Sequence, residues 1–349
     1  MQSDIKDFPK AVYLTITNTC NLRCGMCGQW SPEGYMRGRK STASYSGKEA
    51  SFTDLKKIID ETAAHRAQIG IRGGEPLMYP RIIDLVTYIK SKGINLSVET
   101  NGVLLGKHAE AFVGLRVDHL TISVDGPEEI HDRVRGVKGT YKRLKENLRE
   151  LEAREKKKGY RISRSFTFTI NADNYMALGR MPDVARELGF GVICIVPYYF
   201  VPEAIGKKHE EFMKKNLSCK AYSWRGFHRE ESGVDIDVFL EQLKLYKSNL
   251  GDITSYPYMD FSSEEYREWF TKPYTTVHQD WCRNISGILD IQPDGSVDFC
   301  VDFPDYVLGN IAESSLQEIW NSDRAKKFRE LRSSCEFPVC HRCGAKYMG

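Results

Sequence analysis

The stretch TNTCNLRCGMCGQW, residues 17–30, contains three cysteines, Cys20, Cys24 and Cys27, in the spacing C-x3-C-x2-C. We call these three residues the first cysteine group. They follow an apolar, β-branched run, AVYLTIT at residues 11–17, which is typical of a strand. A loop of this length can wrap three thiolates around one corner of a cubane iron-sulfur cluster and leave the fourth iron without a protein ligand. Structural zinc is the alternative, but it needs four ligands, and no further Cys or His lies nearby in the sequence.

Length, charge and cysteine content limit the possible classes of function. At 349 residues the chain can form a main domain of about 200 residues and a smaller second one. Its 50 basic and 47 acidic residues leave a net charge of +3 and are spread along the sequence, so no nucleic-acid-binding face is expected. The sequence has neither a signal peptide nor an apolar run of about 18 residues, so we expect a cytoplasmic protein with no membrane span. In a reducing compartment its 10 cysteines are better explained as metal ligands or reactive thiols than as disulfides.

Between residues 11 and 200 the sequence alternates strand-like apolar runs with longer helical patterns. Such β/α repeats predict parallel strands joined by right-handed crossovers, with ligands at the carboxyl ends of the strands. The cysteine motif falls at that edge. Strands are predicted at residues 11–17, 68–72, 94–100, 118–124, 165–170 and 190–196, and helices at residues 53–66, 81–93, 141–159 and 175–189.

A second cysteine group, defined as Cys282, Cys300, Cys335, Cys340 and Cys343, lies near the end of the sequence. Residues 287–300, GILDIQPDGSVDFC, predict a β-hairpin that turns at residues 293–295, and residues 315–332 predict a helix. The first two cysteines and the glycine of the turn form the pattern C-x12-G-x4-C. Four of these thiolates could close an iron-sulfur cluster as an electron carrier, and a zinc knuckle is the alternative because tetrathiolate sites suit both metals.

The segment Gly73-Gly74-Glu75-Pro76 ends the second predicted strand. Glycines suit a close approach to the backbone because a Cβ atom would obstruct the partner. Taken alone, this segment could be a plain strand-to-helix turn. Together with the first cysteine group one strand away, it resembles the GGEP motif of the radical S-adenosylmethionine (SAM) superfamily. The ends of the next two strands, Thr100-Asn101-Gly102 and Ser123-Val124-Asp125-Gly126, continue the resemblance.

This resemblance implies that the first cysteine group holds a [4Fe-4S] cluster, whose open iron binds the amino and carboxylate groups of SAM. Reduction would then split SAM and produce a 5′-deoxyadenosyl radical, which abstracts hydrogen from the substrate. An electron donor such as flavodoxin or ferredoxin is the implied partner.

The resemblance also implies roles in SAM binding. Met26 would lie against the adenine, and the backbone of the GGEP segment would take the amino group of SAM. Ser123 would meet the ribose, and Arg135 would pair with the SAM carboxylate through its bidentate fork. On the sixth strand, Val196 or Pro197 would add an apolar wall to the adenine site. The implied SAM-binding set is Met26, Gly73, Gly74, Glu75, Pro76, Thr100, Ser123 and Arg135.

The second cysteine group resembles the SPASM and twitch extensions of radical SAM enzymes, which carry auxiliary [4Fe-4S] clusters. A full SPASM extension uses seven cysteines for two clusters, and only five are present here, so one cluster is favoured. Cys335 is left over as a spare thiol, an alternative ligand or a hydrogen donor to a substrate radical. The resemblance assigns the ligands as Cys282, Cys300, Cys340 and Cys343, which we call the four-cysteine set.

The predicted fold is α/β, with a partial (β/α)6, TIM-like radical SAM barrel at residues 8–205 and a small α+β auxiliary-cluster domain at residues 276–349. Residues 206–275 between them form an aromatic-rich linker region, for which packing is favoured over a substrate-covering role. The remaining thiols, Cys194 and Cys219, are expected to be ordinary buried cysteines, although Cys194 could face the barrel interior. The long loop that follows the first cysteine group is expected to be either a lid or a solvated excursion, and its Arg37, Arg39 and Lys40 would suit an anionic group on the substrate.

The predicted reaction is hydrogen abstraction followed by oxidation through the auxiliary cluster, as in the dehydrogenation of a sugar or an aminocyclitol. A small-molecule substrate is favoured over a ribosomal peptide, because only 19 residues precede Cys20 and peptide-modifying relatives often carry an N-terminal leader-binding domain. Radical epimerisation, with Cys335 or another thiol as hydrogen donor, and peptide maturation are the enzymatic alternatives. A non-catalytic iron-sulfur or zinc protein is the alternative of another class, but it would have no use for the GGEP segment and Arg135.

Overall fold

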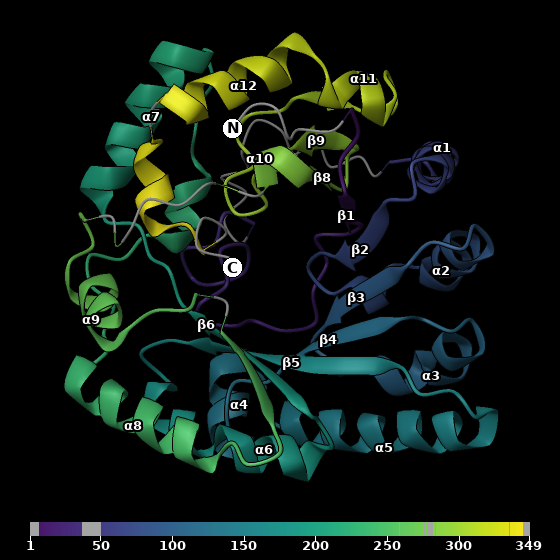
Figure 1. Ribbon diagram of the computed structural model, residues 1–349, viewed down its shortest axis with the longest axis vertical. Helices are drawn as coiled ribbons and strands as arrows, with labels where there is room; N and C mark the ends of the chain where they lie inside the picture. Colours follow the sequence, from purple (N-terminus) through teal and green to yellow (C-terminus); the bar gives the residue numbers. More distant parts are fainter. Residues whose placement is uncertain are drawn as a thin grey trace.

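One curved sheet of ten strands runs through the described part of the chain, and helices cover its outer side (Figure 1). The computed structural model describes residues 7–36, 50–257, 259–275, 277, 282, 284–334 and 336–344. Neighbouring strands follow the order β10-β9-β8-β1-β2-β3-β4-β5-β6-β7. All pairs from β8 through β1 to β7 are parallel, whereas β9 is antiparallel to both β8 and β10.

The six predicted strands are confirmed, and they form the partial barrel. Their ends differ from the prediction by at most two residues, as expected where apolar patterning fades into a loop. The strands are β1 (Ala11–Thr15), β2 (Gln68–Arg72), β3 (Leu96–Thr100), β4 (His119–Ser123), β5 (Ser163–Ile170), β6 (Val192–Pro197), β7 (Thr254–Pro257), β8 (Ile288–Ile291), β9 (Ser296–Asp298) and β10 (Gly309–Asn310).

The helices pack on the outer side of the sheet, where α1, α2, α3 and α5 follow one another around the strands (Figure 1). The predicted helix at residues 175–189 is divided into a 3-10 turn at Tyr175–Arg180 and α6. The helices are α1 (Phe52–Ala64), α2 (Ile82–Ser91), α3 (Leu105–Gly114), α4 (Glu128–Arg135), α5 (Thr140–Lys158), α6 (Met181–Leu188), α7 (Glu203–Leu217), α8 (Ile236–Asn249), α9 (Ser263–Thr271), α10 (Asn284–Gly287), α11 (Leu316–Trp320) and α12 (Asp323–Ser334).

The burial of alternate strand residues determines which side chains face the barrel interior. Val12 in β1 and Ile71 in β2 are fully buried against the helices. Their neighbours Tyr13 and Arg72 are only partly buried and point to the opposite side of the sheet. The same alternation places Glu99 of β3 and Cys194 of β6 on the inner side. These polar side chains therefore line the barrel interior. The cysteine loop leaves the carboxyl end of β1, which is the edge where parallel barrel strands bind ligands.

The seventh parallel strand, β7, was not predicted. It pairs with β6, where Tyr256 lies opposite Cys194, and it has only four residues. Its segment, TSYP, contains no apolar alternation because it lies at the edge of the sheet and two of its residues are exposed. The preceding α8 begins at Ile236 behind an Asp235 cap, whose carboxylate accepts from two backbone N–H groups.

The C-terminal hairpin continues the barrel sheet. Strand β8 pairs in parallel with β1, and β9 turns back after residues 293–295, as predicted. Gly295 permits this turn because its φ is 82°, in the left-handed region. The helix predicted at residues 315–332 is divided into α11 and α12, because Ser322 begins the second helix by accepting from the N–H of Ala325.

Aromatic side chains between the barrel and the hairpin are largely used for packing. Trp224, Phe227, Trp269 and Phe270 are all at least nine-tenths buried. Tyr256 is exposed, and Tyr258 lies outside the described residues. None of the described helices is long and apolar enough to cross a membrane.

Candidate functional site

The first cysteine group lies in the loop that leaves the carboxyl end of β1. Each of its three sulfur atoms accepts one N–H donor: Leu22 N lies 3.4 Å from Cys20, Arg135 Nη1 lies 3.7 Å from Cys24, and Trp30 N lies 3.4 Å from Cys27. Such donors stabilise sulfur that carries negative charge. Burial raises the pKa of the Cys20 thiol to about 12, so its deprotonation depends on a bound metal.

Several contacts hold this loop against the neighbouring strand ends. The side-chain amide of Asn101, after β3, donates to the side-chain oxygen of Asn21 at 2.8 Å. The indole of Trp30 donates to the carbonyl of Asn18 at 2.8 Å, and the N–H of Gly25 donates to Val134 of α4 at 3.2 Å. The loop is therefore positioned by β3 and α4 as well as by its own strand.

The two glycines of the GGEP segment pack against the loop that carries the cysteines. A Cβ atom on Gly74 would lie 2.4 Å from the carbonyl oxygen of Thr19, and one on Gly73 would lie 2.4 Å from that of Thr17. The N–H of Gly74 donates to Thr17 at 2.7 Å, and that of Glu75 donates to Thr19 at 2.8 Å. The absence of side chains on these glycines therefore also lets the GGEP segment pack closely against the cysteine loop. The amino group of SAM is a hydrogen-bond donor, so it would bind to carbonyl oxygens of the GGEP segment.

Glu75 has a structural role in addition to the one inferred from the motif. Its carboxylate accepts from the hydroxyl of Thr100 at 2.7 Å, from the N–H of Asn101 at 2.8 Å and from the N–H of Leu77 at 3.0 Å. Burial raises the pKa of Glu75, and these three hydrogen bonds act in the opposite direction. Glu75 and Thr100, both in the predicted SAM-binding set, therefore bond each other and join the ends of β2 and β3.

Arg135 forms a buried ion pair that the sequence did not indicate. Its Nη2 lies 2.5 Å from Oδ2 of Asp125, which has no solvent exposure. The other carboxylate oxygen of Asp125 accepts from the N–H of Thr169 at 3.2 Å. Asp125 lies two residues after the end of β4, and a charged residue after a buried strand is the signal that could have identified it. Arg135 thus connects the sulfur of Cys24 to the end of β4.

The other residues of the predicted set lie around the same edge. Met26 is partly buried, and Ser123 ends β4 on its inner side. Val196 lies on the inner side of β6 with Cys194, whereas Pro197 is buried on the opposite side. Of the two candidates for an adenine wall, only Val196 faces the barrel interior.

The four-cysteine set lines one pocket, although its members come from two distant segments. Within the described residues, no group of three or more His, Cys, Asp or Glu side chains is gathered for a single metal ion. The four thiol side chains around this pocket suit a [4Fe-4S] cluster, and a tetrathiolate zinc ion is the alternative.

The remaining thiols have different environments. Cys219 donates to the carbonyl of Asp305 at 2.8 Å, so it behaves as the expected structural cysteine. Cys194 faces the barrel interior, where burial and, secondarily, the charge of Glu99 raise the pKa of its thiol to about 11. Cys335 and the basic loop residues Arg37, Arg39 and Lys40 lie outside the described residues.

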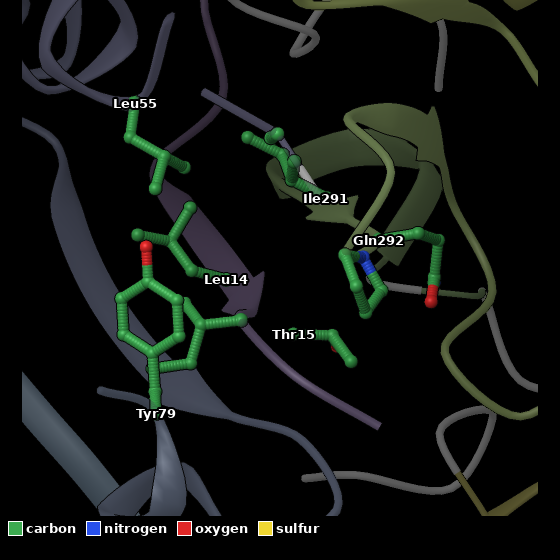
Figure 2. A pocket seen from close by; sticks show the side chains of 9 residues that line it. Leu14, Thr15, Leu55, Tyr79, Ile291 and Gln292 are labelled. Atoms are coloured by element: carbon green, nitrogen blue, oxygen red, sulfur yellow. The ribbon is translucent and has the colours of Figure 1, made fainter. Parts of the chain in front are cut away.

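A small apolar hollow separates α1 from the C-terminal hairpin. Figure 2 shows Leu14, Leu55, Tyr79 and Ile291 around it, with Thr15 at its edge. Among the described residues, the side chains around this hollow are uncharged. Its mostly apolar lining is typical of a packing gap between the barrel and the hairpin.

Comparison with known families agrees with this geometry. The radical SAM superfamily model matches residues 14–171, and the model of an iron-sulfur cluster-binding domain, SPASM, matches residues 282–344. The chain belongs to the radical SAM superfamily. It is a radical SAM enzyme that uses a [4Fe-4S] cluster and SAM, and its SPASM domain carries auxiliary iron-sulfur chemistry.

Relatives of this radical SAM enzyme differ in the reactions that their names describe. An AdoMet-dependent heme synthase of Methanosarcina barkeri is 26% identical over 97% of this chain and 92% of its own length. The Bacillus subtilis sporulation killing factor maturation protein SkfB is 29% identical over 95% of this chain and 68% of its own length. The solved structure of Streptococcus suis SuiB has a TM-score of 0.66 and 14% identity, covering 99% of this chain and 73% of that protein. This last likeness concerns the fold alone.

Proposed function

We propose that this radical SAM enzyme oxidises a polar small molecule by two electrons, with the auxiliary cluster as acceptor of the second electron. The first cysteine group would hold the [4Fe-4S] cluster that binds SAM, and the four-cysteine set would hold the auxiliary cluster. When bound, these groups supply a 5′-deoxyadenosyl radical for hydrogen abstraction and a one-electron acceptor for the resulting substrate radical. The substrate then loses one hydrogen atom, one proton and one electron in total.

The observation that carries the proposal is an apolar cluster shared by the two cysteine groups. Its buried members include Tyr198, Phe227 and Phe303, and partly buried Met26, Cys300 and Cys343 pack against it. Met26 lies between two residues of the first cysteine group, and Cys300 and Cys343 belong to the four-cysteine set. The two sites thus share one water-poor layer of side chains, as electron transfer between a substrate and the auxiliary cluster requires.

The barrel interior supports a polar substrate. Glu99 is partly buried, and its burial raises the pKa of its carboxyl group while the charge of Arg72 opposes the rise. Arg72 itself forms an ion pair with Asp290 of β8 and stacks 4.4 Å above the ring of Tyr13. Hydroxyl, amino or carboxylate groups on a substrate would find partners among these charged side chains.

The proposed class, a small molecule, is consistent with the relative named as a heme synthase, which aligns over 92% of its own length. A peptide substrate is the second candidate. The name of SkfB describes maturation of a killing factor, and SuiB was solved bound to its precursor peptide SuiA. The sugar or aminocyclitol suggested by the sequence remains one example of the small-molecule class.

The test replaces Cys282 and Cys343 by alanine in the full chain, with Cys219→Ala as the matched control. Anaerobic reconstitution should yield about four fewer irons per chain in the double variant, because a cluster without two of its ligands is lost. With dithionite as reductant, both variants should form 5′-deoxyadenosine from SAM. Small-molecule and peptide libraries incubated with the native chain should identify a substrate by a mass loss of two hydrogens.

The outcome for that substrate decides among the alternatives. We expect the double variant to lose the oxidised product while it continues to split SAM. Product formation at the native rate would refute the role of the auxiliary cluster as an acceptor. A product of unchanged mass in ordinary water that gains one deuterium in heavy water would favour radical epimerisation with a thiol as donor. Absence of 5′-deoxyadenosine from the reconstituted native chain would leave the non-catalytic alternative.

A further inference from the structure

Three nitrogen-bearing side chains also line the pocket of the four-cysteine set, namely His209, Asn284 and Arg332. Asn284 already donates to the carbonyl of Phe299 at 3.1 Å, which leaves the other two for a bound group. His209 comes from α7, and Arg332 comes from α12. These helices lie beside each other at the same end of the molecule (Figure 1). The sequence pattern of cysteines and glycine did not indicate either residue.

Arg332 brings buried hydrogen-bond donors to this pocket that the described residues leave unfilled. Its Nε and Nη2 atoms are buried and have no hydrogen-bond partner there. The guanidinium lies close enough to Cys340 and Cys282 for their charges to act on it, and it is hydrogen-bonded to the side chain of Cys340. A buried donor without an acceptor destabilises the folded chain. Sulfur atoms of an anionic cluster in this pocket would supply the missing acceptors.

His209 presents a second unfilled donor or acceptor at the same place. Only 2% of the residue is exposed, and its Nδ1 atom is buried without a partner among the described residues. The ring is held between Phe303 at 6.5 Å and Phe337 at 6.4 Å, measured between ring centroids. Burial lowers the pKa of His209 to about 3, so the ring is neutral and keeps one N–H group. Packing between the two rings therefore holds a neutral imidazole beside the four-cysteine set, and its buried Nδ1 is a donor in the tautomer that carries the proton there.

We propose that Arg332 and His209 set the reduction potential of the auxiliary cluster by donating N–H groups to its sulfur atoms. A cluster gains negative charge when it is reduced, so a fixed guanidinium and aligned N–H dipoles stabilise the reduced state more than the oxidised one. Both residues therefore raise the potential and make the cluster a better electron acceptor. This inference rests on the assignment of the auxiliary cluster to the four-cysteine set.

The experiment uses a full-length parent chain in which the first cysteine group is replaced by alanine, so that only the auxiliary cluster titrates. In this parent, Arg332→Gln removes the charge, Arg332→Lys retains it, and His209→Leu removes the ring donor. The matched control is Lys326→Met, which removes a charge from an exposed position of α12. Iron per chain and a redox titration followed by electron paramagnetic resonance are measured for each.

Arg332→Gln should lower the ratio of reduced to oxidised cluster at a fixed potential at least tenfold, which is about 59 mV for a one-electron couple. His209→Leu should shift the ratio in the same direction, and Arg332→Lys and Lys326→Met should remain near the parent. Potentials of Arg332→Gln and His209→Leu equal to that of Lys326→Met, with full iron content, would overturn the proposal. So would loss of iron from both variants, since the residues would then hold the cluster together instead of tuning it.

The iron content of the parent chain distinguishes a failure of this inference from a failure of the auxiliary-cluster assignment. A parent without about four irons per chain would show that the four-cysteine set does not hold the cluster. A parent with those irons and unshifted variants would leave the cluster in place and reject only the role of Arg332 and His209. Neither result depends on the identity of the substrate.

Discussion

Replacing Arg135 by alanine should lower the free energy of unfolding by about 3–5 kcal/mol, because it leaves the carboxylate of Asp125 buried without its partner. Asp125 has no exposed side-chain surface, and Nη2 of Arg135 lies 2.5 Å from its Oδ2. Unfolding entropy is about 2.1 cal/mol/K per residue, which for a chain of this length converts the loss to about 4–7 °C in melting temperature. A role of Arg135 in SAM binding alone would cause no such loss in the absence of SAM.

The loss should become smaller at lower pH. Burial raises the pKa of Asp125, and Arg135 opposes this rise, so the pKa in the folded variant should be higher still. A carboxyl group whose pKa is higher in the folded chain than in the unfolded chain costs stability above its folded-state pKa. This cost is relieved as the pH falls through that pKa and the group takes up a proton. The Arg135→Ala chain should therefore regain part of its melting temperature as the pH is lowered from neutral through the raised pKa of Asp125.

Circular dichroism during heating of the metal-free chain, without SAM, measures both effects. The matched control is Arg133→Ala on the same helix, because Arg133 is exposed and donates to the carbonyl of Asp173 at 2.7 Å. This surface change should alter the stability by no more than about 0.5 kcal/mol. Equal melting temperatures for the Arg135 and Arg133 variants at neutral pH would refute the reasoning from the buried pair.

Three further predictions concern the SAM edge of the barrel. The chain with the first cysteine group replaced by alanine should keep the iron of the four-cysteine set but form no 5′-deoxyadenosine, and undiminished SAM cleavage would contradict the cluster assignment. Glu75→Gln should lower the free energy of unfolding by about 1–3 kcal/mol, since an amide N–H₂ would then face buried donors, and a native melting temperature would contradict this. Gly74→Ala should displace the cysteine loop and reduce iron retention at the first cysteine group, whereas Gly114→Ala, whose added Cβ meets no atom within 4 Å, should not.

The sequence was sufficient to predict the barrel strands and the position of the first cysteine group. In a strand such as β1, side chains that pack against the helices alternate with side chains that face the barrel interior. This alternation depends only on the two-residue period of the strand backbone. The spacing of Cys20, Cys24 and Cys27 is local, so the loop that carries them could be recognised without its surroundings. Strand β7 was not predicted because its four residues, TSYP, show no alternation of apolar and polar side chains in the sequence.

Contacts between distant segments were decided only by the tertiary structure. The sequence identified Arg135 and Glu75 as candidates, but their partners Asp125 and Thr100 became apparent only when the strand ends met at one edge. Likewise, no spacing rule connects His209 of α7 to the pocket of the four-cysteine set, because it lies more than 70 residues before Cys282 in the chain. Arg332 lies only eight residues before Cys340, but its place in the pocket depends on how α12 packs. A local period or motif determines where a side chain points, whereas its partner depends on how the whole chain packs around the sheet.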